Sequence, residues 1–410
     1  MNMYLVIILA ALAGEWLLNS LARYLNLRAL DPRLPHEFEG ECDTDKYRVA
    51  QEYTRTNTRF KQVVATIQVV IMAGFILLGG FNWVDLMVRA RQLPEIWTGL
   101  LFFGVLFLLS EIVSLPFSIY QLFVIEEKYG FNRTTPGTFV LDKLKSYLLT
   151  VILGGPLLAG ILAFFTFAGP FGWLWAWGVL TLFIIVIPTL YILVIAPMFN
   201  KFKPLAEGEL KEAIISFAGK VNFRLRTIFV VDGSRRSSKA NAYFTGLGRI
   251  KRIVLFDTLV EKHTVEELVS VLAHEVGHYR LKHVAKRMVL QVMQTGLMFY
   301  LLSLFLGNEG VFAAFSMQHI SVYPALLFFS LLYTPVSMLL NPGMMAISRK
   351  HEYDADAWAA KSIGSGDPLI SGLKRLAVEN MSNLTPHPLE VALHYSHPPV
   401  LQRIHALRRS

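Results

Sequence analysis

The stretch VLAHEVGHYRLKH, residues 271–283, carries two histidines four positions apart, His274 and His278, with Glu275 directly after the first. Residues four apart lie on one face of a helix, so both imidazoles can reach the same metal ion. Two imidazoles placed in this way suit zinc, and a glutamate beside the first can act on a metal-activated water. The alternative is an exposed helix on which the two histidines coincide, but the spacing and the helical context favour a catalytic zinc centre.

A catalytic zinc centre needs a third protein ligand and one position left for water. The candidates lie in SRKHEYDADAWAAKS, residues 348–362, which we expect to form a helix with Glu352 and Asp356 one turn apart on one face. Taken alone, this segment would be an ordinary acidic helix. Beside the histidine pair, we predict Glu352 as the third ligand and Asp356 as a group that holds a ligand imidazole or handles a proton.

The chain around these motifs is very apolar. Of its 410 residues, 54% are hydrophobic and only 17% are charged, which excludes an ordinary soluble domain. Several windows of about 18 residues or more hold almost no charge and are long enough to cross a bilayer as helices. We predict seven spans, at residues 3–22, 62–82, 97–124, 146–168, 172–197, 288–307 and 322–343. No Lys or Arg precedes the first, so we expect a retained span rather than a cleaved signal peptide.

The basic residues between these spans predict an orientation. The first connecting loop holds eight Lys or Arg, the second two and the third four, whereas the turns before spans five and seven hold none. Such alternation places the N-terminus outside, and residues 198–287 and 344–410 in the cytosol. The formal net charge of +9 then requires no nucleic-acid partner, because basic residues facing anionic membrane lipids account for it. The single cysteine, Cys42, excludes a disulfide framework and a cysteine-rich zinc site.

The segment between spans five and six has an organisation of its own. Apolar residues recur at helical spacing from Lys203 onward, and residues 227–233, 242–244 and 252–260 are typical of strands. Thr264 and Glu267 form a capping box at the start of the histidine-bearing helix. We therefore expect four parts: five spans in 1–197, a soluble segment with the HEVGH helix in 198–287, spans six and seven in 288–343, and a C-terminal segment with the third ligand in 344–410.

These motifs together resemble those of a known family. HEVGH, SRKHEYDAD and YSHPPVLQRI (395–404), on a chain with seven apolar spans, are similar to the type I CAAX prenyl proteases, as are EEKYGFNRTT (126–135), PMFNKFKPL (197–205) and NAYFTGLG (241–248). The resemblance covers nearly the whole chain. It implies a mainly α, polytopic membrane protein with seven transmembrane helices enclosing a chamber, and a small α+β zincin-like metalloprotease domain on the cytosolic side.

The resemblance also implies an activity and a site. The family cleaves the last three residues from a prenylated CAAX C-terminus, and some members make a second cut upstream. His274, His278 and Glu352 would bind one Zn²⁺, with Glu275 as the catalytic acid/base and Asp356 as the second acidic residue. The chain ends LRRS without an obvious retention signal, which leaves the membrane open; we expect the endoplasmic reticulum if the source is eukaryotic and the inner membrane if it is bacterial.

Three further residues are candidates for the site. Asn241 is placed to begin an exposed sheet edge to which a peptide substrate can add a strand; the alternative is a plain turn residue. His397 precedes two prolines that fix the backbone at a helix start, and it is placed to donate a hydrogen bond to an oxyanion. Arg403 is a candidate to hold a substrate carbonyl or C-terminus. For these two, the alternatives are a structural cap and a surface salt bridge.

Two other functions remain open at this point. A quality-control protease would use the same zinc chemistry on unprenylated membrane proteins. A transporter would line a pathway with polar groups from its spans, but it gives no reason for the HEVGH spacing. The polar residues within the predicted spans face either other helices or a water-filled interior. They are Glu15, Gln68, Glu111, Gln291 and Gln294.

Overall fold

Long apolar helices dominate the structure, a computed structural model that describes residues 2–223, 225, 227–245 and 252–409. Within these residues, six helices are long and apolar enough to cross a membrane, or seven if one bent pair counts as a single span. They are α1 (Met3–Arg28), α2 (Thr44–Leu77), α4 (Glu95–Tyr120), α5 with α6 (Pro136–Leu149 and Gly155–Phe167), α7 (Gly172–Leu190), α12 (His283–Phe305) and the bent pair α14–α15 (Val322–Leu332 and Thr334–Ile363). The prediction of a mainly helical membrane protein is confirmed, and the number of spans reaches the predicted seven when the bent pair is counted as one.

The last span differs from expectation in shape. It bends by 56° between α14 and α15, where Pro335 in the first turn of α15 has no N–H to continue the preceding helix. Beyond the bend, α15 runs unbroken for 30 residues to Ile363, with Pro342 inside it. The span and the separate HEYDAD helix expected from the sequence are therefore one continuous helix, which crosses the expected boundary at residue 344.

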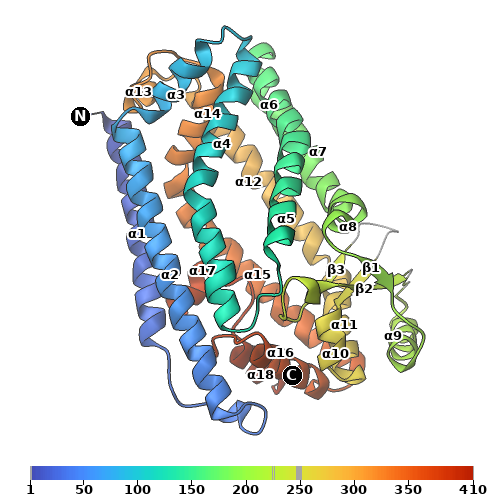
Figure 1. Cartoon of the computed structure of the whole chain (residues 1–410). Helices are drawn as coiled ribbons and strands as arrows, with labels where there is room; N and C mark the ends of the chain where they lie inside the picture. The colour runs from blue at the N-terminus through green and yellow to red at the C-terminus, as the bar shows by residue number, and fades with distance from the viewer. Residues whose placement is uncertain (1, 224, 226, 246–251, 410) are drawn as a thin grey trace.

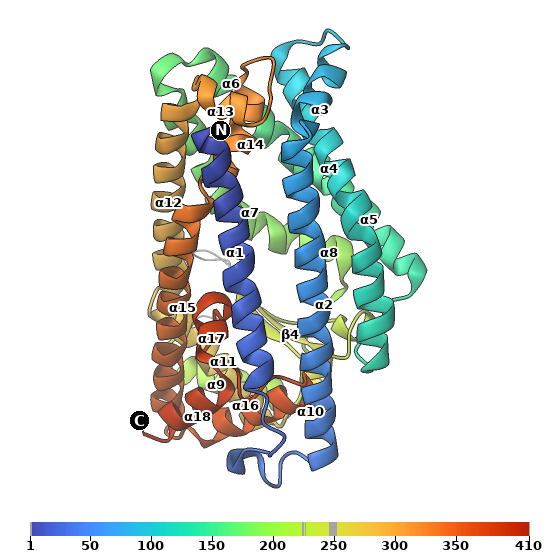
Figure 2. The ribbon, with the colours of Figure 1, turned by 90° about the vertical axis from the view of Figure 1, so that its left-hand side faces the viewer.

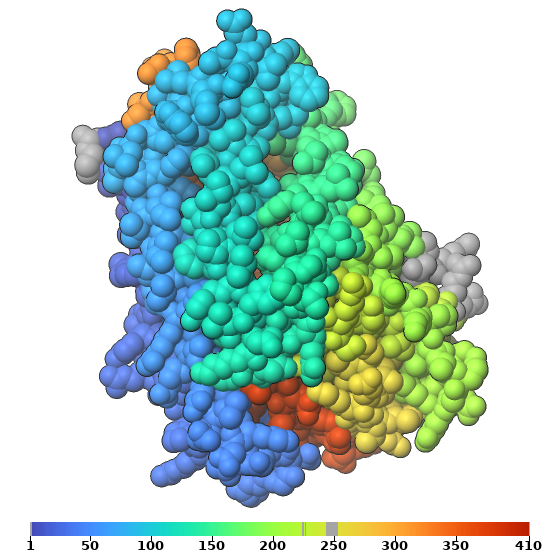
Figure 3. Space-filling model, in the orientation of Figure 1, coloured from blue at the N-terminus to red at the C-terminus, as the bar shows by residue number. Residues whose placement is uncertain are grey.

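The spans stand around a hollow interior rather than forming a solid bundle. Each span packs against its neighbours around the ring, although the order around the ring is not the order in the chain. α1 packs against α2 and α15, α12 against α7, and α6 against α7 and α4. Only 6–17% of the most apolar window of each of the six long spans is buried, whereas a helix in a solid bundle would bury a broad stripe. Figures 1 and 2 show the ring from two sides, and Figure 3 shows gaps between α4 and the α5–α6 helices through which more distant atoms are visible.

A four-stranded sheet lies at one end of the ring. Its strands are β1 (Phe202–Pro204), β2 (Thr227–Val231), β3 (Ala242–Thr245) and β4 (Arg252–Phe256), in the order β1-β2-β4-β3. β2 and β4 are parallel, while β3 runs antiparallel to β4 and forms an edge of the sheet. The expected strand at 252–260 was too long, because residues from Asp257 onward form α10 (Asp257–Lys262). Lys203, expected in a helix, lies in β1 instead, and α9 begins at Glu209.

Helices complete the end of the molecule that carries the sheet. α11 (Val265–Arg280) begins at the predicted capping box, since the Thr264 hydroxyl accepts the Glu267 backbone N–H and the Glu267 carboxylate accepts that of Thr264. Its buried stripe includes Leu268, Leu272 and Val276. The surrounding helices are α9 (Glu209–Lys220), α16 (Asp367–Glu379), α17 (Pro388–His394) and α18 (Val400–Leu407). The short helices α3 (Gly80–Arg89) and α13 (Glu309–Ala314) lie with the N-terminus at the opposite end (Figure 1).

Candidate metal centre

The two halves of the predicted metal site meet where α11 packs along α15. His274 and His278 come from α11 and Glu352 comes from α15, and one ligand atom of each lies within 4.8 Å of the others. The two Nε2 atoms are 3.1 Å apart, and the Glu352 carboxylate oxygens lie 3.4 Å and 3.3 Å from them. The structure therefore brings the three predicted ligands together.

Gly277 permits this close approach of the two helices. A Cβ at this position would lie 3.1 Å from the backbone oxygen of Ala355 and 3.2 Å from its Cα. Those atoms belong to the backbone of α15 and cannot swing aside as a flexible side chain would. The glycine between the two histidines of HEVGH thus sets the separation across which a ligand from α15 can reach them.

The donor atoms and the charge of the cluster fit a divalent cation. Two imidazole nitrogens and a carboxylate are a common ligand set for catalytic zinc. Among the described residues, the buried Glu352 Oε2 has no hydrogen-bond partner, as expected of an atom that serves as a ligand. Burial alone would lower the pKa of His274, but the neighbouring carboxylates of Asp356 and Glu352 outweigh it and raise the pKa to about 9. The surrounding carboxylates therefore stabilise positive charge at this position.

Asp356 and Arg403 form a buried support behind the first ligand. The Oδ1 atom of Asp356 lies 2.8 Å from Nδ1 of His274, on the side of the ring away from the cluster. Arg403 donates two hydrogen bonds to Asp356, of 2.8 Å from Nε and 2.6 Å from Nη2. An outer carboxylate in this position fixes the tautomer and orientation of the imidazole. Arg403 is 9% exposed, so it lies inside the site rather than in a surface salt bridge.

His283 contacts the second predicted ligand, His278, and the sequence did not identify it. Its Nδ1 lies 3.0 Å from Nδ1 of His278, and only 1% of the residue is exposed. Lys282, in a left-handed conformation with φ of 57°, turns the chain between α11 and α12 and places His283 against the ligand. The ring of His283 stacks on His351 with centroids 4.0 Å apart and planes 9° apart. His283 is the last residue of the stretch VLAHEVGHYRLKH, residues 271–283. It lies five positions after His278, and residues five apart on a helix do not share a face, so the spacing gave no sign of this contact.

We expect His283→Ala to weaken zinc binding by about 10- to 100-fold, because partners of the outer nitrogen of a ligand imidazole contribute on this scale. His283→Asn keeps an acceptor oxygen and should lose less. Competition with a chromophoric chelator measures both. His319→Ala, in the exposed connection between α13 and α14, is the matched control. Zinc affinity of His283→Ala within twofold of the parent would exclude this role.

The other predicted residues lie around the cluster or on the sheet. Nε2 of His397 is 3.4 Å from Glu352 Oε1, and its backbone leads through two prolines into α18 as predicted. Glu275 is half-buried beside His274 on α11, and its charge acts on Arg403. Asn241 immediately precedes the edge strand β3, and its carbonyl accepts the Phe256 N–H at 3.1 Å. The described contacts place Asn241 on the sheet and do not join it to the metal cluster.

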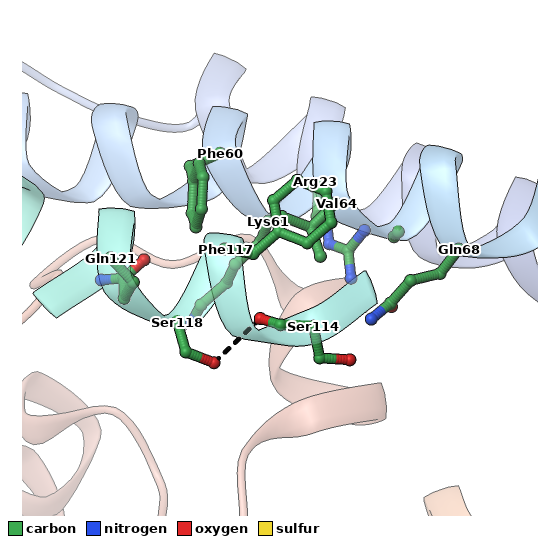
Figure 4. Close-up of a pocket in the computed structure, with 10 residues that line it drawn as sticks. Arg23, Phe60, Lys61, Val64, Gln68, Ser114, Phe117, Ser118 and Gln121 are labelled. Carbon is green, nitrogen blue, oxygen red and sulfur yellow. Dashed lines mark hydrogen bonds between the residues drawn. The ribbon is translucent and has the colours of Figure 1, made fainter. Parts of the chain in front are cut away.

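A separate cavity opens between α1, α2 and α4. None of the residues that line it belongs to the metal cluster. Its volume is about 370 Å³, and Figure 4 shows Arg23 and Lys61 beside aromatic and polar side chains. Gln68 lines this cavity. Glu111 instead accepts hydrogen bonds from Lys143 at 3.0 Å and Tyr147 at 2.6 Å on α5, which is the expected contact between neighbouring helices.

Apolar helices around a hollow interior, with a His-His-Glu cluster backed by an Asp–Arg pair, define a membrane-embedded metalloprotease. Comparison with known proteins agrees. Residues 23–201 match the family described as CAAX prenyl protease N-terminal, five membrane helices, and residues 204–410 match peptidase family M48. The chain therefore belongs to peptidase family M48.

Individual relatives resemble the chain over most of its length. It is 36% identical to the CAAX prenyl protease 1 homolog of Oryza sativa subsp. japonica, over 92% of this chain and 90% of the relative. It is also 36% identical to CAAX prenyl protease 1 of Saccharomyces cerevisiae, over 92% and 89%. The crystal structure of S. mikatae Ste24p superimposes with a TM-score of 0.92 at 34% identity and covers 99% of both chains.

Proposed function

We propose that this protein is a zinc-dependent membrane endopeptidase that removes the C-terminal tripeptide from prenylated CAAX-type substrates. The observation that carries the proposal is the convergence of His274, His278 and Glu352, with Glu275 next to the first ligand. Relatives named CAAX prenyl protease 1 supply the substrate class. Neither a quality-control protease nor a transporter gains support from a specific contact in the described residues.

The residues of the chain divide the work of peptide hydrolysis among them. Bound zinc supplies Lewis acidity, which activates water and polarises the scissile carbonyl. Glu275 takes the proton from the attacking water and passes it to the leaving amine nitrogen. Nε2 of His397 lies at the rim of the cluster and donates to the oxyanion. Asp356 accepts two hydrogen bonds from Arg403, which hold its carboxylate in place. We therefore assign it to orienting His274 rather than to transferring a proton.

We assign the substrate to the edge of β3 that no other described strand covers. An extended peptide can add to such an edge through main-chain hydrogen bonds, with its side chains pointing alternately to either face. Asn241 lies at the entrance to this strand and is placed to contact the peptide. Arg403 carries one further nitrogen, Nη1, 3.8 Å from Glu352, and this is the atom we assign to a substrate carbonyl.

Matched peptides with and without the isoprenoid test the proposed function. We expect the parent protein to release the C-terminal tripeptide from the lipidated peptide with kcat/KM at least about tenfold higher, since a bound apolar group contributes on this scale. The release should stop when zinc is removed and return when it is restored. Equal cleavage of both peptides would favour the quality-control alternative, and no cleavage of either would overturn the proposal.

We also propose that the metal cluster faces the cytosol. Sealed cells that carry single cysteines in a Cys42→Ser background test this with an impermeant reagent. Glu261→Cys and Lys361→Cys, both exposed at the end that holds the cluster, should be protected until the membrane is opened. Gln318→Cys, between α13 and α14 at the opposite end, should label at once. The reverse labelling pattern would show that the cluster faces the outside of the cell.

A further inference from the structure

Two segments far apart in the sequence are bonded to each other beside the sheet. Residues 126–134 follow α4 and residues 233–240 precede β3; together they are called the clamp. An isolated antiparallel bridge joins Asn132 to Ser237. Further bonds run from the Arg133 N–H to the Arg236 carbonyl, from the Ser238 N–H to the Phe131 carbonyl, from the Thr134 hydroxyl to the Arg236 carbonyl, and from the Ser238 hydroxyl to the Gly130 carbonyl, at 2.9–3.1 Å.

Lys239 ties the clamp to the spanning helices. Its ammonium donates to Glu126 Oε2 and to the Tyr53 hydroxyl, each at 2.7 Å, and lies 4.3 Å from the centre of the Phe131 ring. Tyr53 belongs to α2, and its own hydroxyl is 2.6 Å from the other oxygen of Glu126. The ion pair is partly buried, with the Lys239 side chain 35% exposed and that of Glu126 15% exposed. It therefore lies in a setting where the charges are less screened than on an open surface.

Arg236 makes a second set of ties. It donates two hydrogen bonds to Asp142 on α5, at 2.7 Å and 3.0 Å, and a third of 2.9 Å to Asn200 at the end of α8 (Ala196–Phe199). Two parallel bonds from a guanidinium to a carboxylate fix direction as well as distance. Four residues of the clamp, 236–239, are thus connected to α2, α5 and the end of α8.

The same short segment is bonded on its other side to the soluble core. The Thr258 hydroxyl donates to the Lys239 carbonyl at 3.0 Å. Asn380, at the end of α16, accepts the Ala240 N–H at 3.0 Å and donates to the Ala240 carbonyl at 3.1 Å. Asn241 and the edge strand β3 follow immediately. The backbone that enters β3 is therefore held between the membrane-spanning ring and the core that carries the metal cluster.

We propose that the clamp is a positioning device: it fixes β3 relative to the spanning helices and thereby sets which peptide bond, counted from the lipid-bearing residue, is cleaved. This inference rests on the proposed function, in which the substrate lies along β3. In that function the lipid-bearing residue directly precedes the cleaved bond, so the position of the lipid relative to β3 decides which bond lies at the cluster. One residue of an extended strand covers only about 3.3 Å, so a small displacement of β3 changes which bond reaches the cluster. Lys239 and Arg236 are positioning residues in this scheme.

Lys239→Met tests the proposal, because methionine keeps the apolar stem and removes the charge. Zinc content should remain stoichiometric, and a short unlipidated peptide should be cut at the parental rate, since no ligand is altered. For the lipidated peptide, we expect kcat/KM to fall about tenfold and mass spectrometry to detect products displaced by one residue. Glu126→Gln should act in the same way, and the double variant should be no worse than either single one.

Lys262→Met is the matched control, because Lys262 pairs with Glu379 at similar exposure but outside the clamp. It should leave rate and product unchanged. If Lys239→Met is not recovered folded with its zinc, Glu126→Gln carries the same test with less change of shape. Parental rate and a single parental product from the clamp variants would overturn the positioning role. Failure of the parent itself to prefer the lipidated peptide would instead contradict the proposed function.

Discussion

Glu275→Gln is expected to retain zinc and to lose peptide cleavage by about 100- to 10,000-fold, the contribution typical of a positioned general base. The amide keeps the size and shape of the side chain but cannot accept the proton of the attacking water. The three candidate ligands are His274, His278 and Glu352, so the substitution removes none of them. The variant should still bind the lipidated peptide, because the surfaces that hold the substrate are unchanged.

Elemental analysis and kcat, measured on the same preparation, separate this role from a structural one. Glu266→Gln is the control, since Glu266 is exposed in the first turn of the same helix and should be silent. Turnover of Glu275→Gln within a few-fold of the parent would remove Glu275 from the role of base. Loss of zinc from the variant would instead show that Glu275 helps to hold the metal ion.

The second large effect concerns the ligands. A His274→Ala, His278→Ala double variant should contain almost no zinc, since a single remaining carboxylate cannot hold the ion against buffer and water. Binding to the folded state alone also stabilises it, by about 2.7 kcal/mol when free zinc is 100 times Kd. A chelator should therefore lower the unfolding temperature of the parent and leave that of the double variant unchanged.

Zinc stoichiometry of each variant, with His319→Ala as control, decides the assignment. Glu352→Gln should also lose zinc, because it removes the negative charge that lies 3.4 Å and 3.3 Å from the two imidazoles. Stoichiometric zinc in the double histidine variant would place the ion elsewhere. Asp356→Asn should have a smaller effect, since Asp356 contacts the outer nitrogen of His274 and not the cluster itself.

The parts of the site that could be predicted from the sequence are those with local signals. His274 and His278 lie on adjacent turns of one helix, and the Thr264–Glu267 capping box marks where that helix begins. The spans could be predicted because lipid requires long apolar helices. Glu352 could be proposed because an acidic pair on a helix stood near a histidine pair that lacked a ligand.

The parts that the sequence did not predict depend on contacts between distant residues. β1 forms because Phe202–Pro204 pairs with β2, which lies more than 20 positions later. No local sequence pattern indicates that pairing. Lys239 and Glu126 are 113 positions apart. Pro342 would ordinarily end a helix, yet α15 continues through it, so the last span and the HEYDAD segment could not be recognised as one element. His283 escaped notice because a left-handed residue, rather than a helical spacing, brings it to His278.

The close approach at Gly277 has a consequence for how this sequence can vary. The position carries no chemistry, yet a single added methyl group would press on the backbone of Ala355, which has no side-chain freedom to yield. The two helices would have to move apart, and the gap across which Glu352 faces the histidines would widen with them. The spacing between the three candidate ligands thus depends on the smallest residue in the motif, so we expect a substitution there to disturb the site although no ligand is changed.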